Sequence, residues 1–173
     1  MPRYLLSLMI LTLVLGLSAC KREPKSPETD QTAESAIPGT IFRKDGELSI
    51  LAPDGNLRGS FGIELANTER TITQGLMYRE SMASNQAMLF DPQGLSRNPF
   101  WMKNTYLPLD ILFIDDERRI MHIAENTHPF SEETIQPGGI YRYVLEINAG
   151  LAHQLKLNIG DTLTWTLAPS TGS

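Results

Sequence analysis

Cysteine is almost absent from this 173-residue chain, in which Cys20 is the only one. A single thiol cannot close a disulfide within the chain. We expect Cys20 itself to be modified, as argued below, so the folded part has no thiol left for catalysis. The fold must therefore be held by its core alone.

Basic residues are outnumbered by acidic ones, with 15 Lys and Arg residues against 20 Asp and Glu residues. The chain has no basic stripe with interleaved aromatic residues, which argues against a nucleic-acid partner. It also lacks a phosphate-binding glycine loop and a serine nucleophile elbow, so no cofactor is expected. The three histidines do not have the spacing of zinc ligands, and we expect no metal site: His122, His128 and His153.

The chain has no apolar run long enough for a membrane-spanning helix. The longest one, from Leu5 to Leu17, falls short of the roughly 20 residues that a span needs. It follows the basic Arg3 and precedes small residues, which is typical of a secretory signal. Because Cys20 comes directly after Leu17-Ser18-Ala19, this leader resembles the signal of bacterial lipoproteins. An ordinary leader beside a free thiol is the alternative.

The lipoprotein resemblance implies that Cys20 carries a lipid anchor and that the protein is exported to the cell envelope. Several acyl chains together hold a protein stably on a membrane, since each buried methylene contributes about 0.8 kcal/mol. Lys21 after the cysteine favours the outer membrane, on its periplasmic side.

Composition divides the chain into four parts. Residues 1–19 are the expected signal peptide. Residues 20–39 are an expected lipidated tether, because they are rich in proline and polar residues and cannot bury enough apolar surface to fold. Residues 40–169 suit one mainly β domain, and 170–173 form an expected disordered tail.

The domain alternates short apolar segments with turn signals. This pattern predicts a single-domain β sandwich or open barrel with two short capping helices. Thr68 is the expected cap of the first helix, which runs to about Arg79, and the second helix covers 149–157. The expected strands are 41–51 (a broken start), 61–66, 87–90, 109–114, 119–125, 141–148 and 162–167.

The stretch from Asn98 to Asp115 carries the most concentrated chemistry. Pro108 forces an extended approach to an apolar strand, so the polar residues before it should lie outside the core. Trp101 beside Asn104 and Asp110 is what a cleft for a small polar ligand, such as a saccharide, would use. The alternative is that Trp101 only closes one end of the core.

Three carboxylates stand in or beside apolar strands: Asp110, Glu125 and Glu146. We expect Asn104 and Asp110 at one open end of the β core, with Glu125 or Glu146 facing the same end. Two such groups could act as acid and base. In the structural alternative, Asp110 caps the amides of Asn104 and Thr105, and Glu146 pairs with Arg79 or Arg142.

Several blocks along the domain resemble the Domain of Unknown Function 192 family. The resemblance covers about 63–167 and implies a compact, mainly β, often exported domain without an established activity. The blocks that carry it are Gly75–Arg79, Met88–Phe90, Phe100–Thr105, Pro108–Asp115, Arg142–Glu146 and Gly160–Asp161.

Three hypotheses for the function follow. The first is a lipid-anchored binding or accessory module of the cell envelope with a polar-aromatic cleft. The second is a hydrolase-like enzyme that uses carboxylates on a polar, saccharide-like envelope substrate. The third is a structural partner of envelope proteins without a small-molecule site. The candidate site residues are Arg79, Trp101, Asn104, Asp110, Glu125 and Glu146.

Overall fold

The computed structural model describes residues 41–169. The expected signal peptide, the lipidation site Cys20, the tether and the four-residue tail lie outside the described residues. Within the described part, no helix has the length and apolarity needed to cross a membrane.

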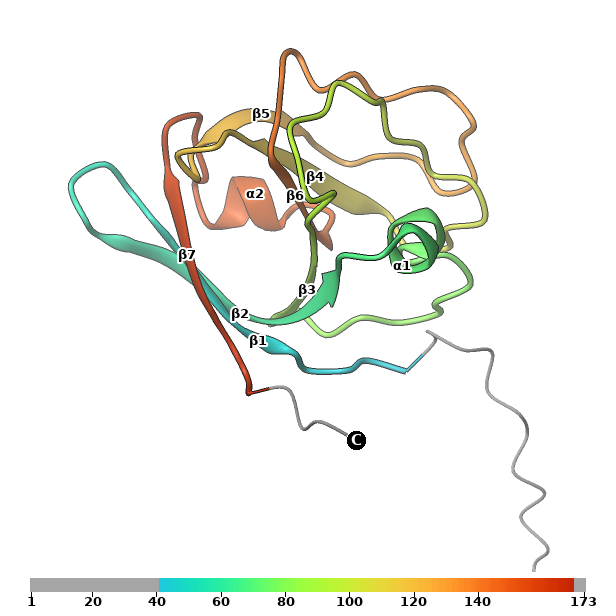
Figure 1. The fold of residues 1–173 in the computed structure, drawn as a ribbon, viewed down its shortest axis with the longest axis horizontal. Coiled ribbons are helices and arrows are strands. Elements are labelled where there is room, and N and C mark those ends of the chain that lie inside the picture. The colour runs from blue at the N-terminus through green and yellow to red at the C-terminus, as the bar shows by residue number, and fades with distance from the viewer. Residues whose placement is uncertain (1–40, 170–173) are drawn as a thin grey trace, which may run out of the picture. The chain divides into compact units, whose positions relative to one another are not determined.

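The domain is built on one curled sheet of seven strands (Figure 1). The strand order is β5-β4-β6-β3-β2-β1-β7, and all neighbours are antiparallel except the parallel pair β2 and β3. The strands are β1 (Gly46–Leu51), β2 (Leu57–Ala66), β3 (Gln86–Phe90), β4 (Leu109–Ile114), β5 (Ile120–Ala124), β6 (Tyr143–Asn148) and β7 (Thr162–Leu167).

The two outer strands of the sheet approach each other at one end. The Ile120 amide donates to the Asp161 carbonyl at 2.9 Å, and the Leu163 amide donates to the Arg118 carbonyl at 2.8 Å. An isolated bridge between Arg119 and Thr162 lies beside these bonds. The sheet is therefore a partly closed barrel, which confirms the predicted mainly β fold with an open barrel.

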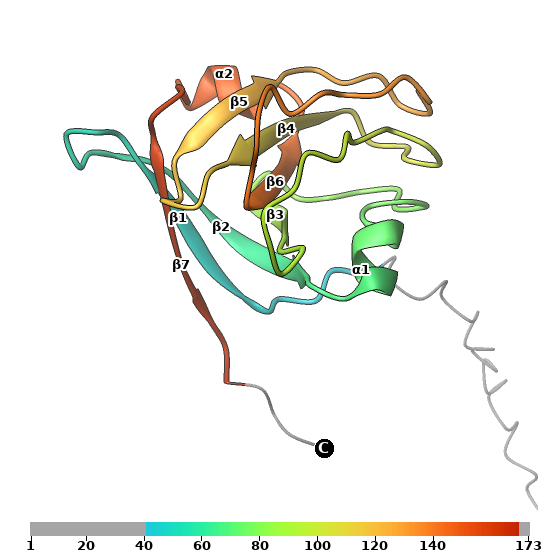
Figure 2. The same cartoon turned by 45° about the horizontal axis from the view of Figure 1, so that its top comes forward.

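Two short helices complete the fold, as predicted. In α1 (Glu69–Gln74), the Thr68 hydroxyl accepts from the Thr71 amide at 3.2 Å and caps the first turn. The predicted end near Arg79 was too late, because Gly75 takes a backbone φ of 48° that ends the helix. The second helix, α2 (Leu151–Gln154), lies over one end of the barrel (Figure 2).

The sheet buries apolar side chains on both of its faces, so the fold has two hydrophobic clusters. The inner cluster fills the curl of the sheet and includes Leu112 and Ile114. The outer cluster includes Ile111 and Phe113, the alternate residues of the same strand. All six residues of β4 are buried, which explains why its sequence is apolar at every position but Asp110 rather than alternating.

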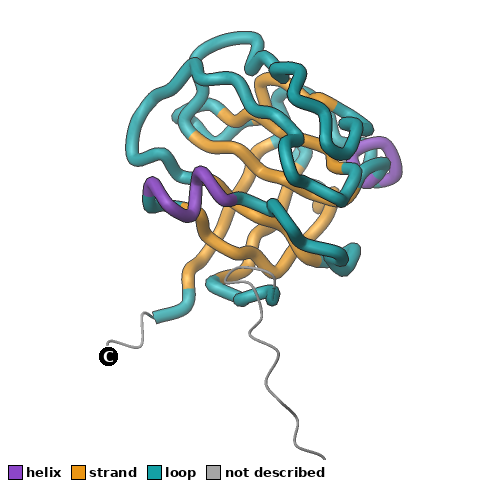
Figure 3. Tube along the Cα trace, turned by 90° about the vertical axis from the view of Figure 1, so that its right-hand side faces the viewer, coloured by secondary structure: helices purple, strands orange, loops and turns teal. Residues whose placement is uncertain are grey.

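Long loops cover the outer cluster on the side where α1 lies. Figure 2 shows the segments before β4 and after β5 extending past the sheet on this side, and Figure 3 shows that loops rather than helices form most of its surface. Binding and catalytic residues often lie on loops that a rigid sheet holds in place, so a functional site is expected on this loop-covered face.

Candidate functional site

A groove of about 330 Å³ opens between α1 and the loop that leads to β4. Aromatic rings make up much of its wall, and three small polar side chains lie among them. We call it the aromatic groove; it is lined by Ile72, Thr73, Phe90, Pro92, Ser96, Asn98, Pro99, Phe100, Trp101 and Tyr141.

Backbone pairing and ring packing fix the wall of the groove. The segment before β4 pairs with the segment before β6 through the bridges Phe100–Ile135 and Ser96–Tyr141. The Tyr141 hydroxyl donates to the Asn98 carbonyl at 3.1 Å. The Phe100 ring lies edge-to-face on Phe90, with 5.3 Å between ring centroids. The aromatic groove is therefore preformed rather than a gap between mobile loops.

Trp101 is the most exposed aromatic residue of the groove, with half of its surface accessible to solvent. Its neighbour Met102 is buried in the outer cluster, which anchors the loop directly beside it. The Lys103 ammonium group lies 5.8 Å from the centre of the indole ring. A large ring held at the mouth of a groove and left half in water is suited to stacking against a ligand.

A smaller hollow of about 40 Å³ adjoins the groove and extends toward the sheet. The two share Phe90, Phe100 and Trp101, and the smaller one is also lined by Glu146. We call it the inner pocket. Glu146 lies in the middle of β6, where the strand register places it opposite Ile111 on the outer face of the sheet.

The Glu146 carboxyl is buried and lies in an electrostatically unusual position. Burial raises its pKa to about 8, and the positive charge of Arg79 offsets only part of that rise. At neutral pH the group is therefore a neutral acid with one O–H to donate. Among residues 41–169, no hydrogen bond to this carboxyl is found.

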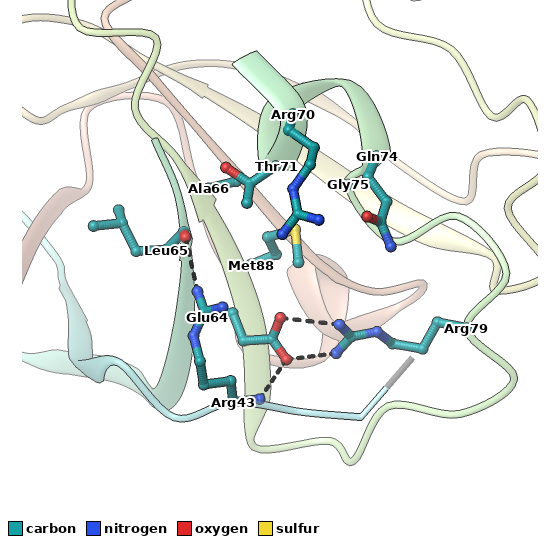
Figure 4. A pocket seen from close by; sticks show the side chains of 10 residues that line it. All are labelled: Arg43, Glu64, Leu65, Ala66, Arg70, Thr71, Gln74, Gly75, Arg79 and Met88. Carbon is teal, nitrogen blue, oxygen red and sulfur yellow. Dashed lines mark hydrogen bonds and ion pairs between the residues drawn. The ribbon is translucent and has the colours of Figure 1, made fainter. Parts of the chain in front are cut away.

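Arg79, whose charge acts on Glu146, forms its ion pair with Glu64. Its two terminal nitrogens donate to the two Glu64 oxygens at 2.7 and 2.9 Å, and both side chains are buried (Figure 4). The Arg43 amide donates to the same carboxylate at 2.7 Å. Of the two arginines predicted as partners of Glu146, Arg142 pairs with Asp91, and Arg79 pairs with Glu64 while its charge also acts on Glu146.

The structure does not bring Asp110 to the groove. The register pairs it with Ile147, so its side chain lies on the inner face, whereas Glu146 is on the outer face. The fully buried carboxylate accepts from the amides of Asn126 and Ala152, each at 2.8 Å. Asp110 therefore does not cap the amides of Asn104 and Thr105, as the structural alternative predicted. Its hydrogen bonds connect β4 to α2 and to the residues that follow β5.

The other two candidates also lie outside the groove. Asn104 occupies a tight turn with a backbone φ of 54°, and its carbonyl accepts from the Tyr78 amide at 2.9 Å. Glu125 follows β5 and is exposed to solvent. Because Ile111 pairs with Ala124, Glu125 follows the β5 residue that lies across from the neighbour of Asp110. Of the six candidate residues, only Trp101 and Glu146 line the groove or its inner pocket.

Sequence reasoning missed Glu64 and most of the groove wall. A usable signal for Glu64 was present, because it stands between Ile63 and Leu65 in the otherwise apolar segment 61–66. Ser96, Asn98 and Tyr141 gave no local signal, since their segments meet only through long-range pairing. Among the described residues, no group of three or more His, Cys, Asp or Glu side chains could hold a metal ion.

Comparisons with known proteins give a family but no activity. The family model of Domain of Unknown Function 192, described as Uncharacterized ACR, matches residues 50–165. No curated protein matches the chain significantly.

Two crystal structures are similar to this chain over nearly their whole length. One is a Sinorhizobium meliloti protein described provisionally as a transcription regulator, with 38% identity, a TM-score of 0.69, and 73% of this chain and 98% of that chain covered. The other, a Novosphingobium aromaticivorans protein of unknown function, has 34% identity, a TM-score of 0.67, and 79% and 99% of the two chains covered.

Proposed function

The chain belongs to the Domain of Unknown Function 192 family, and from that premise we propose that it is a lipid-anchored binding module of the cell envelope. Its ligand is a small neutral molecule with both polar groups and an apolar face. The single observation that carries this proposal is the preformed aromatic groove of about 330 Å³ with the half-exposed Trp101 at its mouth.

A saccharide is the ligand class that fits this groove best. One face of a sugar ring is apolar and stacks on an indole, while its hydroxyl groups need donors and acceptors nearby. The groove offers the side chains of Thr73, Ser96 and Asn98 for that purpose. The neutral Glu146 acid in the inner pocket supplies one further donor, aimed at a hydroxyl or carbonyl oxygen of the ligand.

Binding is better supported than hydrolysis. A glycoside hydrolase ordinarily uses two carboxyl groups on either side of the bond it cleaves. Within the described part of the chain, Glu146 is the only carboxyl that lines the groove or the inner pocket. Asp110 is on the opposite face of the sheet, and Glu125 is exposed away from the groove lining.

The envelope location in this proposal rests on the leader and on Cys20, which lie outside the described residues. The sequence Leu17-Ser18-Ala19-Cys20 supports a lipid anchor, and Lys21 supports the outer membrane facing the periplasm. The saccharides of the envelope would then be within reach of the domain.

One observation supports the alternative of a protein partner. Tyr78, Tyr106 and Phe130 come from three different loops, and each is at least 40% exposed. Their rings contact in series, with centroid distances of 6.5 Å for the first pair and 5.1 Å for the second. An exposed cluster of this kind is typical of contact surfaces.

The proposed function is tested by measuring saccharide binding with matched aromatic variants. We expect the full chain in non-ionic detergent to bind N,N′-diacetylchitobiose or maltose saturably. Trp101→Ala should weaken binding at least tenfold, because the stacking surface is lost. Phe130→Ala removes another exposed aromatic ring and should leave binding unchanged. Equal affinity of the Trp101→Ala protein and the unaltered protein would contradict the proposal.

A further inference from the structure

A second hollow lies between α1 and the buried pair of Glu64 and Arg79 (Figure 4). Its volume is about 70 Å³, and Gln74 and Gly75 belong to the walls of both hollows. We call it the arginine pocket, after the three arginines among the residues that line it: Arg43, Glu64, Leu65, Ala66, Arg70, Thr71, Gln74, Gly75, Arg79 and Met88.

The charges around the arginine pocket do not balance. Its lining holds three guanidinium groups and one carboxylate, Glu64, which is already paired with Arg79. Arg43 pairs with Asp45 just outside the lining, at 2.6 Å. Arg70 has no acidic group within ion-pair distance among residues 41–169. One positive charge is therefore left over at the edge of the pocket.

The buried pair forms a rigid floor that a negative ligand can approach. Both Glu64 oxygens are occupied, one by the Arg43 amide and both by Arg79, so the carboxylate is fixed and neutralised. Arg70 extends from α1 toward Met88 and Glu64, and Arg43 runs along the opposite side (Figure 4). The exposed Arg70 guanidinium group and the Arg43 guanidinium group, which Asp45 holds in place, thus flank a fixed floor.

We propose that the arginine pocket binds a phosphate-sized oxyanion. The planar guanidinium fork matches the spacing of two oxygens on a phosphate, so Arg70 can donate a pair of hydrogen bonds. Arg43 can add a bond from its second terminal nitrogen, because Asp45 and the Leu65 carbonyl hold the other two nitrogens of its guanidinium group. The volume of about 70 Å³ accommodates a small anion. The site is separate from the aromatic groove, so it stands whether or not that groove binds a saccharide.

Two sources could supply the same chemistry: free inorganic phosphate, or the phosphate of a phospholipid headgroup. Arg43 lies close in sequence to the start of the domain, just after the segment that we expect to be the membrane tether. The experiment therefore has an arm for each source.

The test is a titration of the full chain in non-ionic detergent with sodium phosphate against sodium chloride at equal ionic strength, followed by calorimetry. We expect saturable binding of phosphate, and at least tenfold weaker binding to Arg70→Gln. Arg70 is exposed, so this substitution should not disturb folding. Arg97→Gln is the matched control, because it removes the same charge from an exposed loop residue outside the pocket.

The vesicle arm distinguishes the two sources. If the natural ligand is a headgroup, phosphatidylglycerol vesicles should bind the Cys20→Ala protein more tightly than phosphatidylcholine vesicles do, and Arg70→Gln should abolish the difference. If it is free phosphate, the two vesicles should bind alike. The proposal would be overturned if the unaltered protein did not bind phosphate. It would also be overturned if Arg70→Gln and Arg97→Gln weakened phosphate binding equally.

Discussion

Three charged side chains lie beneath the loops that cover the outer face of the sheet: Glu64, Arg79 and Glu146. The first two form a buried pair, and burial raises the pKa of the third to about 8 despite the charge of Arg79. Burying any of these groups costs free energy, and a buried ion pair seldom repays that cost fully. Their presence in an apolar layer is most simply explained by the pockets that they line.

The first prediction concerns the pH dependence of stability. Burial raises the pKa of Glu146 from 4.5 to about 8, with Arg79 as the charged group opposing the rise. Between these two pH values the unfolded chain releases a proton that the folded chain keeps, so this group makes stability fall as pH rises. Glu146→Gln is neutral throughout and should remove that fall. Urea unfolding at pH 5 and pH 9 measures it.

The expected difference between the two proteins across this range is on the order of a few kcal/mol, in favour of Glu146→Gln at the higher pH. Asp110→Asn is the control, since it alters a buried carboxylate on the other face and leaves Glu146 in place. Identical pH profiles for the unaltered protein and Glu146→Gln would show that this carboxyl ionises normally.

The second prediction concerns the buried pair. Arg79→Met leaves the Glu64 carboxylate buried without its partner and should cost about 3–5 kcal/mol of stability. Adding Glu64→Gln removes the stranded charge and keeps an acceptor for the Arg43 amide, so the double variant should recover part of that loss. Denaturant unfolding of the single and double variants measures both steps. A double variant less stable than Arg79→Met would contradict this account.

At the scale of elements, the strands were largely predictable and the site was not. The boundaries of β4 and β7 match the predicted segments. Apolar runs and alternating patterns are formed by consecutive residues, so they can be recognised in the sequence. The aromatic groove depends on Ser96 meeting Tyr141 and on Phe100 meeting Ile135, and no local pattern reports such pairings. Asp110 was recognised in the sequence as a carboxylate in an apolar strand. The face of the sheet on which its side chain lies depends on the pairing of β4 with β6, which the sequence does not show.

The third prediction concerns the junction between α1 and the groove. Gly75 has a φ of 48° and a ψ of −133°, and a methyl group there would lie 3.3 Å from the Phe90 ring. Gly75→Ala should therefore cost about 1–3 kcal/mol and displace a wall of the groove. Thermal unfolding measures the cost, with Gly94→Ala as the control because its methyl group would meet open space. Equal effects of the two substitutions would contradict the argument.

The whole molecule is, in our proposal, a lipid-anchored chain whose folded domain has two separate pockets. Residues of α1 line both the aromatic groove and the arginine pocket, so one short helix shapes both. The lipid anchor is inferred from the sequence alone, because Cys20 lies outside the described residues.

The fourth prediction concerns this anchor. Because Cys20 is the only cysteine and follows a lipoprotein-like leader, Cys20→Ala should abolish lipidation and release the protein from membranes. Labelling cells with radioactive palmitate and separating the membrane fraction measures both effects. Label on the Cys20→Ala protein would exclude Cys20 as the attachment site.

Saccharide binding in the aromatic groove can be followed directly with the two tryptophans of the chain as internal reporters. Trp101 lies at the mouth of the groove, whereas Trp165 packs on Tyr143 and Arg118 at β7. With ¹⁵N-labelled indoles, each gives its own N–H resonance during a titration with N,N′-diacetylchitobiose or maltose. We expect a saturable shift of the Trp101 signal and an unmoved Trp165 signal. A Trp101 signal that stays in place with both saccharides would contradict the proposed binding.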